Sequence, residues 1–380
     1  MSVSLIDYIN ALKTNTRKYI IKLEMLDFWT ENVVTTITSD FIDGDIQINK
    51  ENGARRSASI TLNNIDGDYT PDPDGIIWLN SKIRIYTGLE VGGENYYVSR
   101  GIFVVNEPDV SSNFSEKIVT LSLLDKWCLL NDTLSGQVEY DFIIPVGTNL
   151  GEAVEMVLEE AGEPKPLIYE ETTIVTPYTL VVEAGGTFSD ILIKLSEMAS
   201  MNIFYDKDGF PRLQSPTDTD IAGSVWDFNN TEPLYMGANR NYDMSKVRNV
   251  VRVVGDSIEG TIYDYTASDT DSNSPTFTGT APDYTDGIGR RVKVIYDDLI
   301  YSESLAEDRA NYELEQAIQI YESVPTKTGC VDLINEDNII TITDSSLGLD
   351  EDRFLVQSIN FPIRQNRPMD LNVWKVRSFV

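Results

Sequence analysis

Closely spaced aspartates are the residues of this chain whose type and spacing come nearest to a binding site. Two groups could supply the several oxygen ligands that a calcium ion needs. The first group is Asp66, Asp68, Asp72 and Asp74, and the second is Asp269, Asp271 and Asn273. Neither fits the EF-hand loop, because Pro71 and Ser274 stand where that loop has glycine. Aspartates are also frequent in turns, so an Asp-rich turn is the alternative at both places and we assign no metal ligand.

Histidine chemistry is excluded, because the chain contains no histidine. Ser-His-Asp and Cys-His catalysis and histidine metal sites are therefore ruled out. Two carboxyl groups suffice for a glycosidase, but among 61 acidic residues a pair occurs by chance. No glutamate stands in an apolar context that would raise its pKa, and the glycine pairs Gly185-Gly186 and Gly287-x-Gly289 lack the rest of a phosphate-binding motif. The sequence favours a protein that is not an enzyme and assigns no catalytic or cofactor-binding residue.

The charge of the chain narrows its range of partners. Thirty Lys and Arg oppose 61 Asp and Glu, for a net charge of −31. A surface this acidic repels nucleic acid and anionic membranes, because phosphate binding depends on Lys and Arg. Solubility is a sufficient explanation for the charge. The alternative is an acidic wall past which DNA slides without binding.

Length, hydropathy and cysteine content indicate a globular protein made in the cytoplasm. A chain of 380 residues can form two to four domains, and 41% of the residues are hydrophobic. No stretch approaches the roughly 18 apolar residues of a membrane span, and the N-terminus lacks the pattern of a signal peptide. We therefore expect no membrane anchoring. Cys128 and Cys330 are expected to be reduced and buried, with no disulfide between them.

The first third of the chain has the pattern of an antiparallel β-structure. Residues 4–13 fit a short amphipathic helix, and from Arg17 onward apolar and polar residues alternate. Further strands with turn residues between them are predicted at residues 44–48, 57–62, 82–86, 96–105 and 117–124. Strands at this spacing without helices between them predict an antiparallel barrel or sandwich.

The middle of the chain predicts a small α+β module. Two amphipathic helices and a β-hairpin with an Asp-Gly turn are expected at residues 149–162, 187–202 and 203–213. Asn149 and Thr187 would cap the helices, and Asn202 could end the second helix in a left-handed conformation. Strands and a linker are expected over residues 164–186, and a turn-rich bridge over residues 216–246.

The last third begins with a strand at residues 247–255. Residues 259–308 hold eleven acidic and three basic residues, which is typical of a solvated loop or a channel wall. A helix over residues 304–321 begins with Ser304-x-x-Glu307 and cannot continue beyond Pro325. The remaining strands are predicted at residues 329–333, 338–343, 353–361 and 369–378.

Three segments, taken in order, resemble phage-tail baseplate hub proteins. In residues 59–86 a strand leads into an Asn64-x-Asp66-Gly67 turn, an aromatic residue, Pro71 and a second strand. Residues 187–215 resemble the helix and hairpin, ending in Asp-Gly-x-x-x-Leu, that recur in hubs. Residues 247–316 follow the order of the hub core, with a strand, an acidic excursion, a Gly-containing strand and a helix. The resemblance covers almost the whole chain, although no single motif is diagnostic.

The resemblance implies an α+β, mainly β fold in which two antiparallel β-barrels like those of the tail tube flank the helix–hairpin module. The implied domains are residues 1–135, 136–225 and 226–380, with helix 304–321 in the last. The implied function is that of a structural virion protein, a homotrimeric ring that joins the six-fold tail tube to a three-fold tip or spike and conducts DNA during ejection. The implied partners are a tail tube or distal tail protein, a tape measure protein and a spike or tip protein. DNA would be present only in transit, and assembly would take place in the host cytoplasm.

Two other functions remain open for this sequence. Many hubs of long flexible tails carry a C-terminal fibre, peptidase or hydrolase, whereas this chain stops at Val380 after the last predicted strand, so we expect a compact hub. The alternatives are a phage-associated cell-wall glycosidase and a carbohydrate-binding module for receptor attachment. The carbohydrate-binding alternative requires exposed aromatic residues in a row. The tryptophans are scattered in strand contexts and most should be buried: Trp29, Trp78, Trp127, Trp226 and Trp374.

Overall fold

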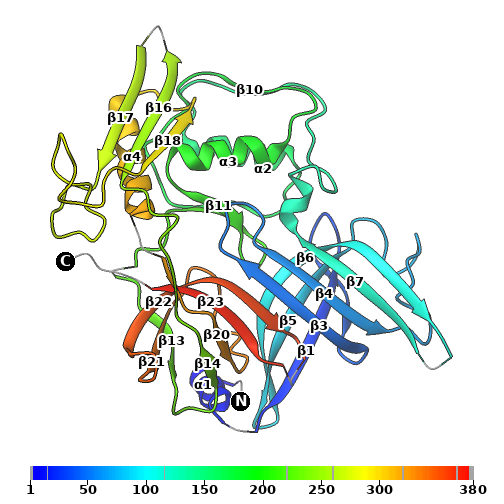
Figure 1. Ribbon diagram of the computed structural model, residues 1–380. Coiled ribbons are helices and arrows are strands. Elements are labelled where there is room, and N and C mark those ends of the chain that lie inside the picture. The colour runs from blue at the N-terminus through cyan, green and yellow to red at the C-terminus, as the bar shows by residue number, and fades with distance from the viewer. Residues whose placement is uncertain are drawn as a thin grey trace.

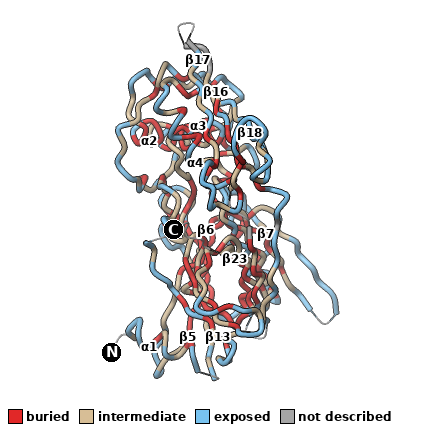
Figure 2. Tube along the Cα trace, turned by 60° about the vertical axis from the view of Figure 1, so that its left-hand side comes forward, coloured by how far each residue is buried: buried red, intermediate tan, exposed pale blue. Residues whose placement is uncertain are grey.

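The computed structural model of the protein describes residues 3–14, 16–114, 116–219, 221–258, 261–318, 321–364 and 367–375. Strands account for 43% and helices for 14% of the chain, and the pairings of the one large sheet are antiparallel except for a single parallel pair. This confirms the mainly β class that the sequence predicted. A large sheet fills the lower part of Figure 1 together with helix α1, and helices α2, α3 and α4 lie above it. The turned view in Figure 2 shows the same two levels along one elongated molecule.

The N-terminal helix α1 (Leu5–Leu12) packs against the large sheet. Ser4 caps the helix, and the side chain of Asp7 completes a capping box. Tyr8 and Leu12 are fully buried in the core of the sheet. The Tyr8 hydroxyl donates a 2.5 Å hydrogen bond to the carboxylate of Asp332. The helix therefore joins the N-terminus to a residue more than 300 positions away in the sequence.

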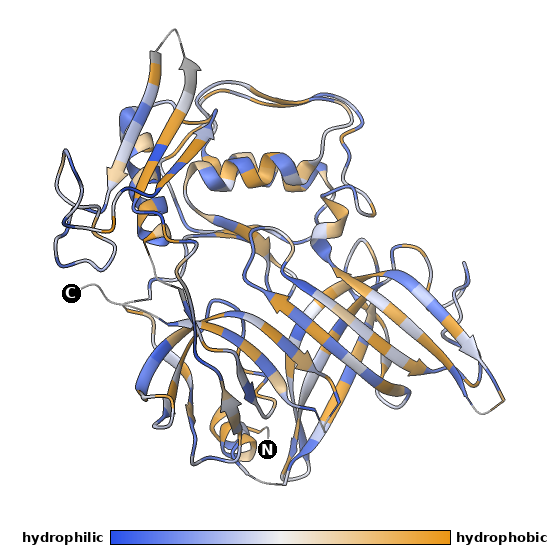
Figure 3. Ribbon diagram, viewed as in Figure 1, coloured by the Kyte–Doolittle hydropathy of each residue, from blue (hydrophilic) through white to orange (hydrophobic). Residues whose placement is uncertain are grey.

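The first third of the chain supplies seven strands of the large sheet, and all their mutual pairings are antiparallel. Their order in space is β3-β4-β7-β6-β5-β1-β2. Their bounds are β1 (Lys18–Leu26), β2 (Val33–Ile37), β3 (Phe41–Asn49), β4 (Arg56–Asn63), β5 (Lys82–Val91), β6 (Glu94–Ser112) and β7 (Lys117–Asp125). Buried and partly exposed residues alternate along β4 and β7, and Figure 3 shows the alternation of hydropathy along the strands. Six of the seven strands were predicted, and β2 was not.

C-terminal strands extend this same sheet. Strand β22 (Leu349–Pro362) pairs antiparallel with β3, and beyond it lie β23 (Met369–Lys375), β20 (Thr326–Thr328) and β14 (Tyr235–Ala238). Side branches are formed by β21 (Ile339–Asp344), β13 (Ser224–Asn229), β19 (Tyr321–Ser323) and β15 (Asn241–Asp243). One core cluster includes buried residues from both ends of the chain. The pairing path through the described strands ends at β14 and β2, so closure into two barrels stays a prediction.

A helical module with its own core follows the first strands. It begins with a 3₁₀ turn, η1 (Lys126–Leu129), and contains helices α2 (Leu150–Glu160) and α3 (Phe188–Met198). Asn149 and Thr187 cap these helices, as predicted. The hairpin of β11 (Asn202–Tyr205) and β12 (Pro211–Gln214) is also as predicted, and β9 (Ile168–Tyr169) adds to it in parallel. Strands β8 (Phe142–Ile144) and β10 (Leu180–Val182) form a second small sheet.

A third unit consists of one small sheet and one helix. Strand β16 (Val250–Ile258) lies between β17 (Thr261–Ser268) and β18 (Val292–Asp297), antiparallel to the first and parallel to the second. Helix α4 (Glu303–Ala317) packs against β16 and β17. Val251, Val253 and the alanines of α4 form the buried contact. The predicted domain bounds 1–135, 136–225 and 226–380 stay a prediction, since strand pairing alone does not decide them.

Several predicted element ends differ from the structure around helices α3 and α4. Helix α4 ends at Ala317, and Tyr321 already belongs to β19, which pairs with β15. Its N-cap is Ser302, whose hydroxyl accepts a hydrogen bond from Leu305 N–H, and Ser304 lies inside the helix. After α3 the left-handed residue is Ser200, while Asn202 begins β11. Strand pairing accounts for the positions of Tyr321 and Asn202, whereas the N-cap of α4 is a local hydrogen bond.

Two predictions for the strands of the last third also need correction. No strand occupies residues 329–333; instead Gly329 N–H donates a 2.8 Å hydrogen bond to Leu234 O, directly after β20. The bridge over residues 216–246 contains β13, β14 and β15, because distant strands offer it backbone partners. The predicted strand 369–378 is observed as β23 up to Lys375, and its remaining residues lie outside the described part of the chain.

Candidate functional site

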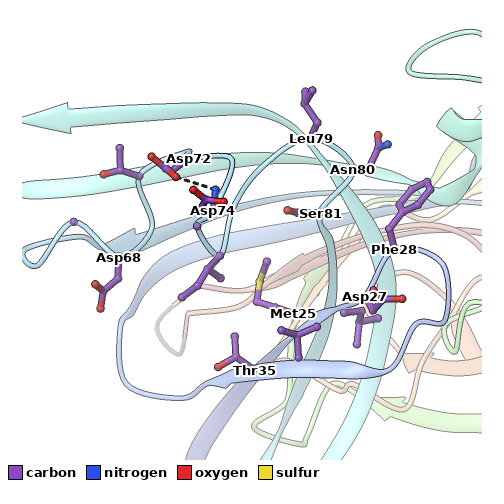
Figure 4. A pocket seen from close by; sticks show the side chains of 16 residues that line it. Met25, Asp27, Phe28, Thr35, Asp68, Asp72, Asp74, Leu79, Asn80 and Ser81 are labelled. Atoms are coloured by element: carbon purple, nitrogen blue, oxygen red, sulfur yellow. Dashed lines mark hydrogen bonds between the residues drawn. The ribbon is translucent and has the colours of Figure 1, made fainter.

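The first group of aspartates lies in a turn on the wall of a surface groove. Asp72 Oδ1 accepts a 2.9 Å hydrogen bond from the backbone N–H of Asp74, as Figure 4 shows. This bond is the kind that makes aspartate frequent in turns. Over the described ranges of the chain, no group of three or more His, Cys, Asp or Glu side chains could hold a metal ion. Asp68, Asp72 and Asp74 line the groove, and Asp66 is not part of the lining.

The second group of aspartates closes a loop between β17 and β18. Asp269 is buried, and its Oδ2 accepts 2.6 Å hydrogen bonds from the hydroxyls of Ser274 and Thr276. Asp269 Oδ1 accepts a 3.3 Å bond from Asp271 N–H, and Asp271 in turn accepts one from Asn273 N–H. The Asp-x-Asp-x-Asn pattern is thus explained by hydrogen bonds within the loop.

Both thiols and the buried Asp125 have structural surroundings. Cys128 and Cys330 are free and buried, as predicted, and burial raises the pKa of each thiol to about 12. Burial also raises the pKa of Asp125 to about 6. The Asp125 carboxylate accepts hydrogen bonds from the N–H groups of Trp127 and Arg56, at 3.0 and 3.2 Å. Asp125 is only 4% exposed, so it positions the backbone of Arg56 and Trp127 and does not face a substrate.

A buried ion cluster joins the large sheet to the helical module. Glu31, in the β1–β2 turn, lies 2.9 Å from Lys82 Nζ, 2.8 Å from Lys126 Nζ and 3.1 Å from Lys165 Nζ. Lys126 Nζ also lies 2.6 Å from Glu163, which follows α2 and accepts a 2.7 Å hydrogen bond from the Tyr205 hydroxyl. The sheet supplies Glu31 and Lys82, and the module supplies the other side chains. The cluster therefore determines how the module sits on the sheet.

The cluster contains three ammonium groups and two carboxylates. Burial alone would raise the pKa of Glu31, but the Lys126 and Lys82 ammonium groups more than offset burial and lower it to about 2. Burial lowers the pKa of Lys82, and the neighbouring Lys126 lowers it further. The surplus of positive charge favours the ionised form of Glu31 and, together with burial, disfavours the ionised form of Lys82. Removal of the Glu31 charge would leave these ammonium groups poorly compensated.

A second set of ion pairs joins the same parts of the molecule. Arg56 Nη2 donates hydrogen bonds to both oxygens of Glu336, at 2.5 and 2.7 Å, and Arg56 Nη1 donates to Tyr205 O. Arg55 Nη1 donates a 2.7 Å bond to Asp337, and its guanidinium lies 3.4 Å from the ring centroid of Phe204. Planar arginine forks suit such two-pronged contacts. Arg55 and Arg56 therefore connect the hairpin β11–β12 to strand β4 and to the loop before β21.

Contacts from α4 join the third unit to the helical module. The Arg309 guanidinium donates a hydrogen bond to the backbone carbonyl of Glu197, at the end of α3, and lies 3.1 Å from Glu313 in its own helix. The Tyr178 hydroxyl donates a 3.0 Å bond to Asp298 O, just after β18. Polar contacts therefore connect the large sheet to the helical module, and the helical module to the third unit.

The groove lies between the β1–β2 hairpin and the loop that leads from β4 to β5 (Figure 4). Its volume is about 850 Å³. Its lining residues are Met25, Leu26, Asp27, Phe28, Val34, Thr35, Gly67, Asp68, Thr70, Asp72, Asp74, Gly75, Ile76, Leu79, Asn80 and Ser81. The lining combines apolar side chains with four carboxylates and includes no Lys or Arg. Such a surface suits a ligand that is both apolar and basic.

An apolar surface is exposed on the side of β18 that faces away from α4. Val292, Val294 and Tyr296 alternate along this strand and are 50%, 47% and 80% exposed. Lys293, on the opposite side of the strand, reaches Glu313 of α4 at 2.6 Å. Three exposed apolar residues on one strand face are a candidate contact surface for another chain.

The chain is similar to known proteins in its structure and not in its sequence. No protein-family model and no curated protein matches the chain. The tail protein from Neisseria meningitidis MC58 matches with a TM-score of 0.67 over 94% of this chain and 97% of that one, at 13% identity. The 43 kDa tail protein of prophage MuSo2 from Shewanella oneidensis matches with a TM-score of 0.61 over 94% and 98%, at 15% identity. The prophage tail protein gp18 from Listeria monocytogenes EGD-e matches with a TM-score of 0.56 over 93% and 94%, at 10% identity.

These similarities show that the chain has the fold of phage tail proteins. The fold spans nearly all of this chain and nearly all of each of the three tail proteins. The mainly β fold of a phage tail protein is what the sequence resemblance implied. The identities of 10–15% support a common fold only.

Sequence reasoning assigned no site residue and missed both charged features. Glu31 and Lys82 stand in ordinary turn and strand contexts, and nothing local indicates that they meet. The tryptophan prediction holds for Trp127 and Trp226, each 4% exposed, whereas Trp29 and Trp78 are 67% and 42% exposed. Ile76 and Leu79, large apolar residues in a Pro- and Gly-containing loop, were a further signal for the groove beside the aspartates.

Proposed function

We propose that this protein is a structural component of a phage tail, the baseplate hub. The observation that carries the proposal is the fold shared with three tail proteins over at least 93% of every chain compared. The order of motifs in the sequence supports the same role. In this role the chain is part of the virion tail. Within the described residues, the helices are too short or too polar to span a membrane.

We further propose that the hub is a homotrimeric ring. In such a ring three copies of a two-part β-structure face the six-fold tail tube on one side and the three-fold tip or spike on the other. The exposed apolar face of β18 supports self-association. So does the terminal strand β14, where Met236 is 58% exposed beside a hollow of about 280 Å³ that includes Pro325 and Leu371. The further proposed partners are a tail tube or distal tail protein, a tape measure protein and the spike or tip protein.

The ring is proposed to conduct DNA during ejection without binding it. The net charge of −31 supports this part of the proposal, because phosphate affinity depends on Lys and Arg. Exposed acids of the third unit, among them Asp264, Asp283 and Asp308, are candidates for the lining of the opening. A structure of the assembled ring with a neutral or basic opening would refute the proposal that DNA slides past an acidic wall, and it would leave the hub proposal in place.

Mass in solution tests the proposal. Light scattering after size exclusion, at a series of concentrations, should give a species of three times the 42.7 kDa chain mass. Negative-stain images of that species should show rings. A monomer at every concentration would contradict a self-assembled trimer, and binding assays with tube and spike proteins would then decide whether a partner is required.

A further inference from the structure

The groove between the β1–β2 hairpin and the β4–β5 loop runs beside an unprotected sheet edge. Strand β2 is the last strand of the pairing path and pairs with β1 only, among the strands that the structure describes. Val33 and Val34 on this strand are 49% and 69% exposed. An exposed apolar edge strand offers unpaired backbone groups and is a ready position for another strand.

A bulge interrupts the pairing of β2 with β1 at Val34. Leu26 lies opposite Val33 and Met25 lies opposite Thr35, so Val34 is an extra residue without a partner on β1. Val34 lines the groove, and Ile76 and Leu79 line it from the β4–β5 loop. Leu79 is 79% exposed. The groove thus has apolar side chains on both walls next to free backbone groups.

The charge of the groove is entirely negative. Asp27, Asp68, Asp72 and Asp74 line it. Lys82 is not part of the lining; its ammonium lies 4.7 Å from the ring centroid of Phe28 and is bound to Glu31 at 2.9 Å. Hydrogen bonds from the Thr30 hydroxyl and N–H lower the pKa of Asp27, which keeps this group ionised.

We propose that this groove binds an extended, basic segment of a partner protein, which adds to the edge of β2 and places Lys or Arg side chains against the four aspartates. Apolar side chains of the segment, at alternate positions, contact Val34 and Leu79. This inference goes beyond the proposed tail role and does not depend on it.

The charges of the groove and of the chain favour a partner of opposite charge. A second copy of this chain carries a net charge of −31, which opposes its approach to an acidic groove. Nucleic acid is repelled for the same reason. A basic peptide segment remains as the class of ligand that satisfies the carboxylates, the apolar walls and the strand edge together.

A pair of synthetic peptides tests the proposal. The probe is a fluorescein-labelled ten-residue peptide in which lysine alternates with valine, and the comparison peptide has glutamate at every lysine position. Fluorescence anisotropy with the full chain should show binding of the lysine peptide and none of the glutamate peptide. Equal binding of both peptides would overturn the proposal.

Two groove variants and one control locate the binding. Asp68→Asn with Asp74→Asn removes two charges, and the peptide should bind about tenfold more weakly, since an exposed ion pair changes an affinity by a few fold. Val34→Pro removes an N–H group at a residue without a partner on β1 and should also weaken binding, with the charges unchanged. The control is Asp283→Asn with Asp308→Asn, two exposed acids of the third unit, and it should change affinity less than twofold. An equal loss in this control would mean attraction to net charge alone and would overturn the proposal.

Cross-linking gives a readout that does not depend on folding of the variants. A photoreactive benzophenone in the middle of the lysine peptide should link to residues of β2 or of the loop 66–81 in the unaltered protein. Mass spectrometry of the linked fragments identifies the site. Linkage to any other part of the chain would overturn the proposal.

Discussion

The buried ion cluster around Glu31, called the junction below, and the surface groove use acidic side chains in opposite ways. At the junction, Glu31 is 5% exposed and lies within 3.1 Å of three ammonium groups. In the groove, Asp68 and Asp74 lie on an open wall whose lining contains no basic side chain. A buried carboxylate must be paired because of its desolvation cost, whereas an exposed one can remain unpaired in water. The comparison indicates that paired acids hold this molecule together and unpaired acids are available to partners.

Removal of the Glu31 charge should have the largest effect on stability. Glu31→Gln leaves the ammonium groups of Lys82, Lys126 and Lys165 with Glu163 as their main compensation. A broken buried ion pair typically costs about 3–5 kcal/mol, and we expect a loss of unfolding free energy in this range. Urea-induced unfolding followed by circular dichroism measures it.

The matched control is an exposed ion pair of the same sheet. Glu90 lies 2.5 Å from Lys18, whose side chain is 67% exposed. Glu90→Gln should cost about 0–1 kcal/mol, the range of surface pairs. If both substitutions lowered the unfolding free energy by the same amount, the buried and the exposed ion pair would not differ in their contribution to stability.

The stability gap between the unaltered chain and Glu31→Gln should depend on pH. Lys126 and Lys82 overcome the effect of burial and lower the pKa of Glu31 from 4.5 to about 2. Because the folded pKa lies below the unfolded one, the stabilisation is complete above about pH 4.5 and is lost as the pH falls toward about 2. Urea unfolding at a series of pH values should show the gap narrowing between about pH 5 and pH 3. A gap that widens toward acid pH would contradict the ion pairing.

Neutralisation of the groove acids should have the smallest effect on stability. Asp68→Asn with Asp74→Asn removes two like charges from an open loop, and Asp72, which accepts the hydrogen bond in the turn, stays in place. We expect a change of less than about 0.5 kcal/mol, in the stabilising direction. Thermal unfolding beside the unaltered chain measures it. A loss of more than about 1 kcal/mol would mean that these acids support the fold and would remove the contrast with the junction.

Local patterns were sufficient for elements whose burial repeats at short range. Helix α1 was predictable from Ser4, Asp7 and the spacing of Tyr8 and Leu12, and β4 from the alternation of its residues. The caps at Asn149 and Thr187 were predictable because a capping side chain bonds to a backbone N–H two or three residues away. The short strand β2 escaped prediction because only one of its five residues is buried.

The site was less predictable than the fold, because its parts meet only through strand pairing. The aspartates of the 66–74 turn were visible in the sequence, but their calcium-like spacing did not show that they line a groove. Trp78 and Leu79 are exposed because their loop borders the β1–β2 hairpin, which belongs to a different segment of the chain.

The sequence by itself determined the mainly β class, the capped helices, the hairpin at residues 203–213, the two buried thiols and the acidic character of the surface. These properties follow from residue types and from spacings of two to four residues, which act through local backbone geometry. Only the tertiary structure decided that β22 pairs with β3 in one continuous sheet, that Glu31 meets three lysines, and that β2 forms an open edge beside four aspartates. Each of these contacts joins residues far apart in the chain, and the choice among possible partners depends on packing of the whole molecule, which no short segment encodes.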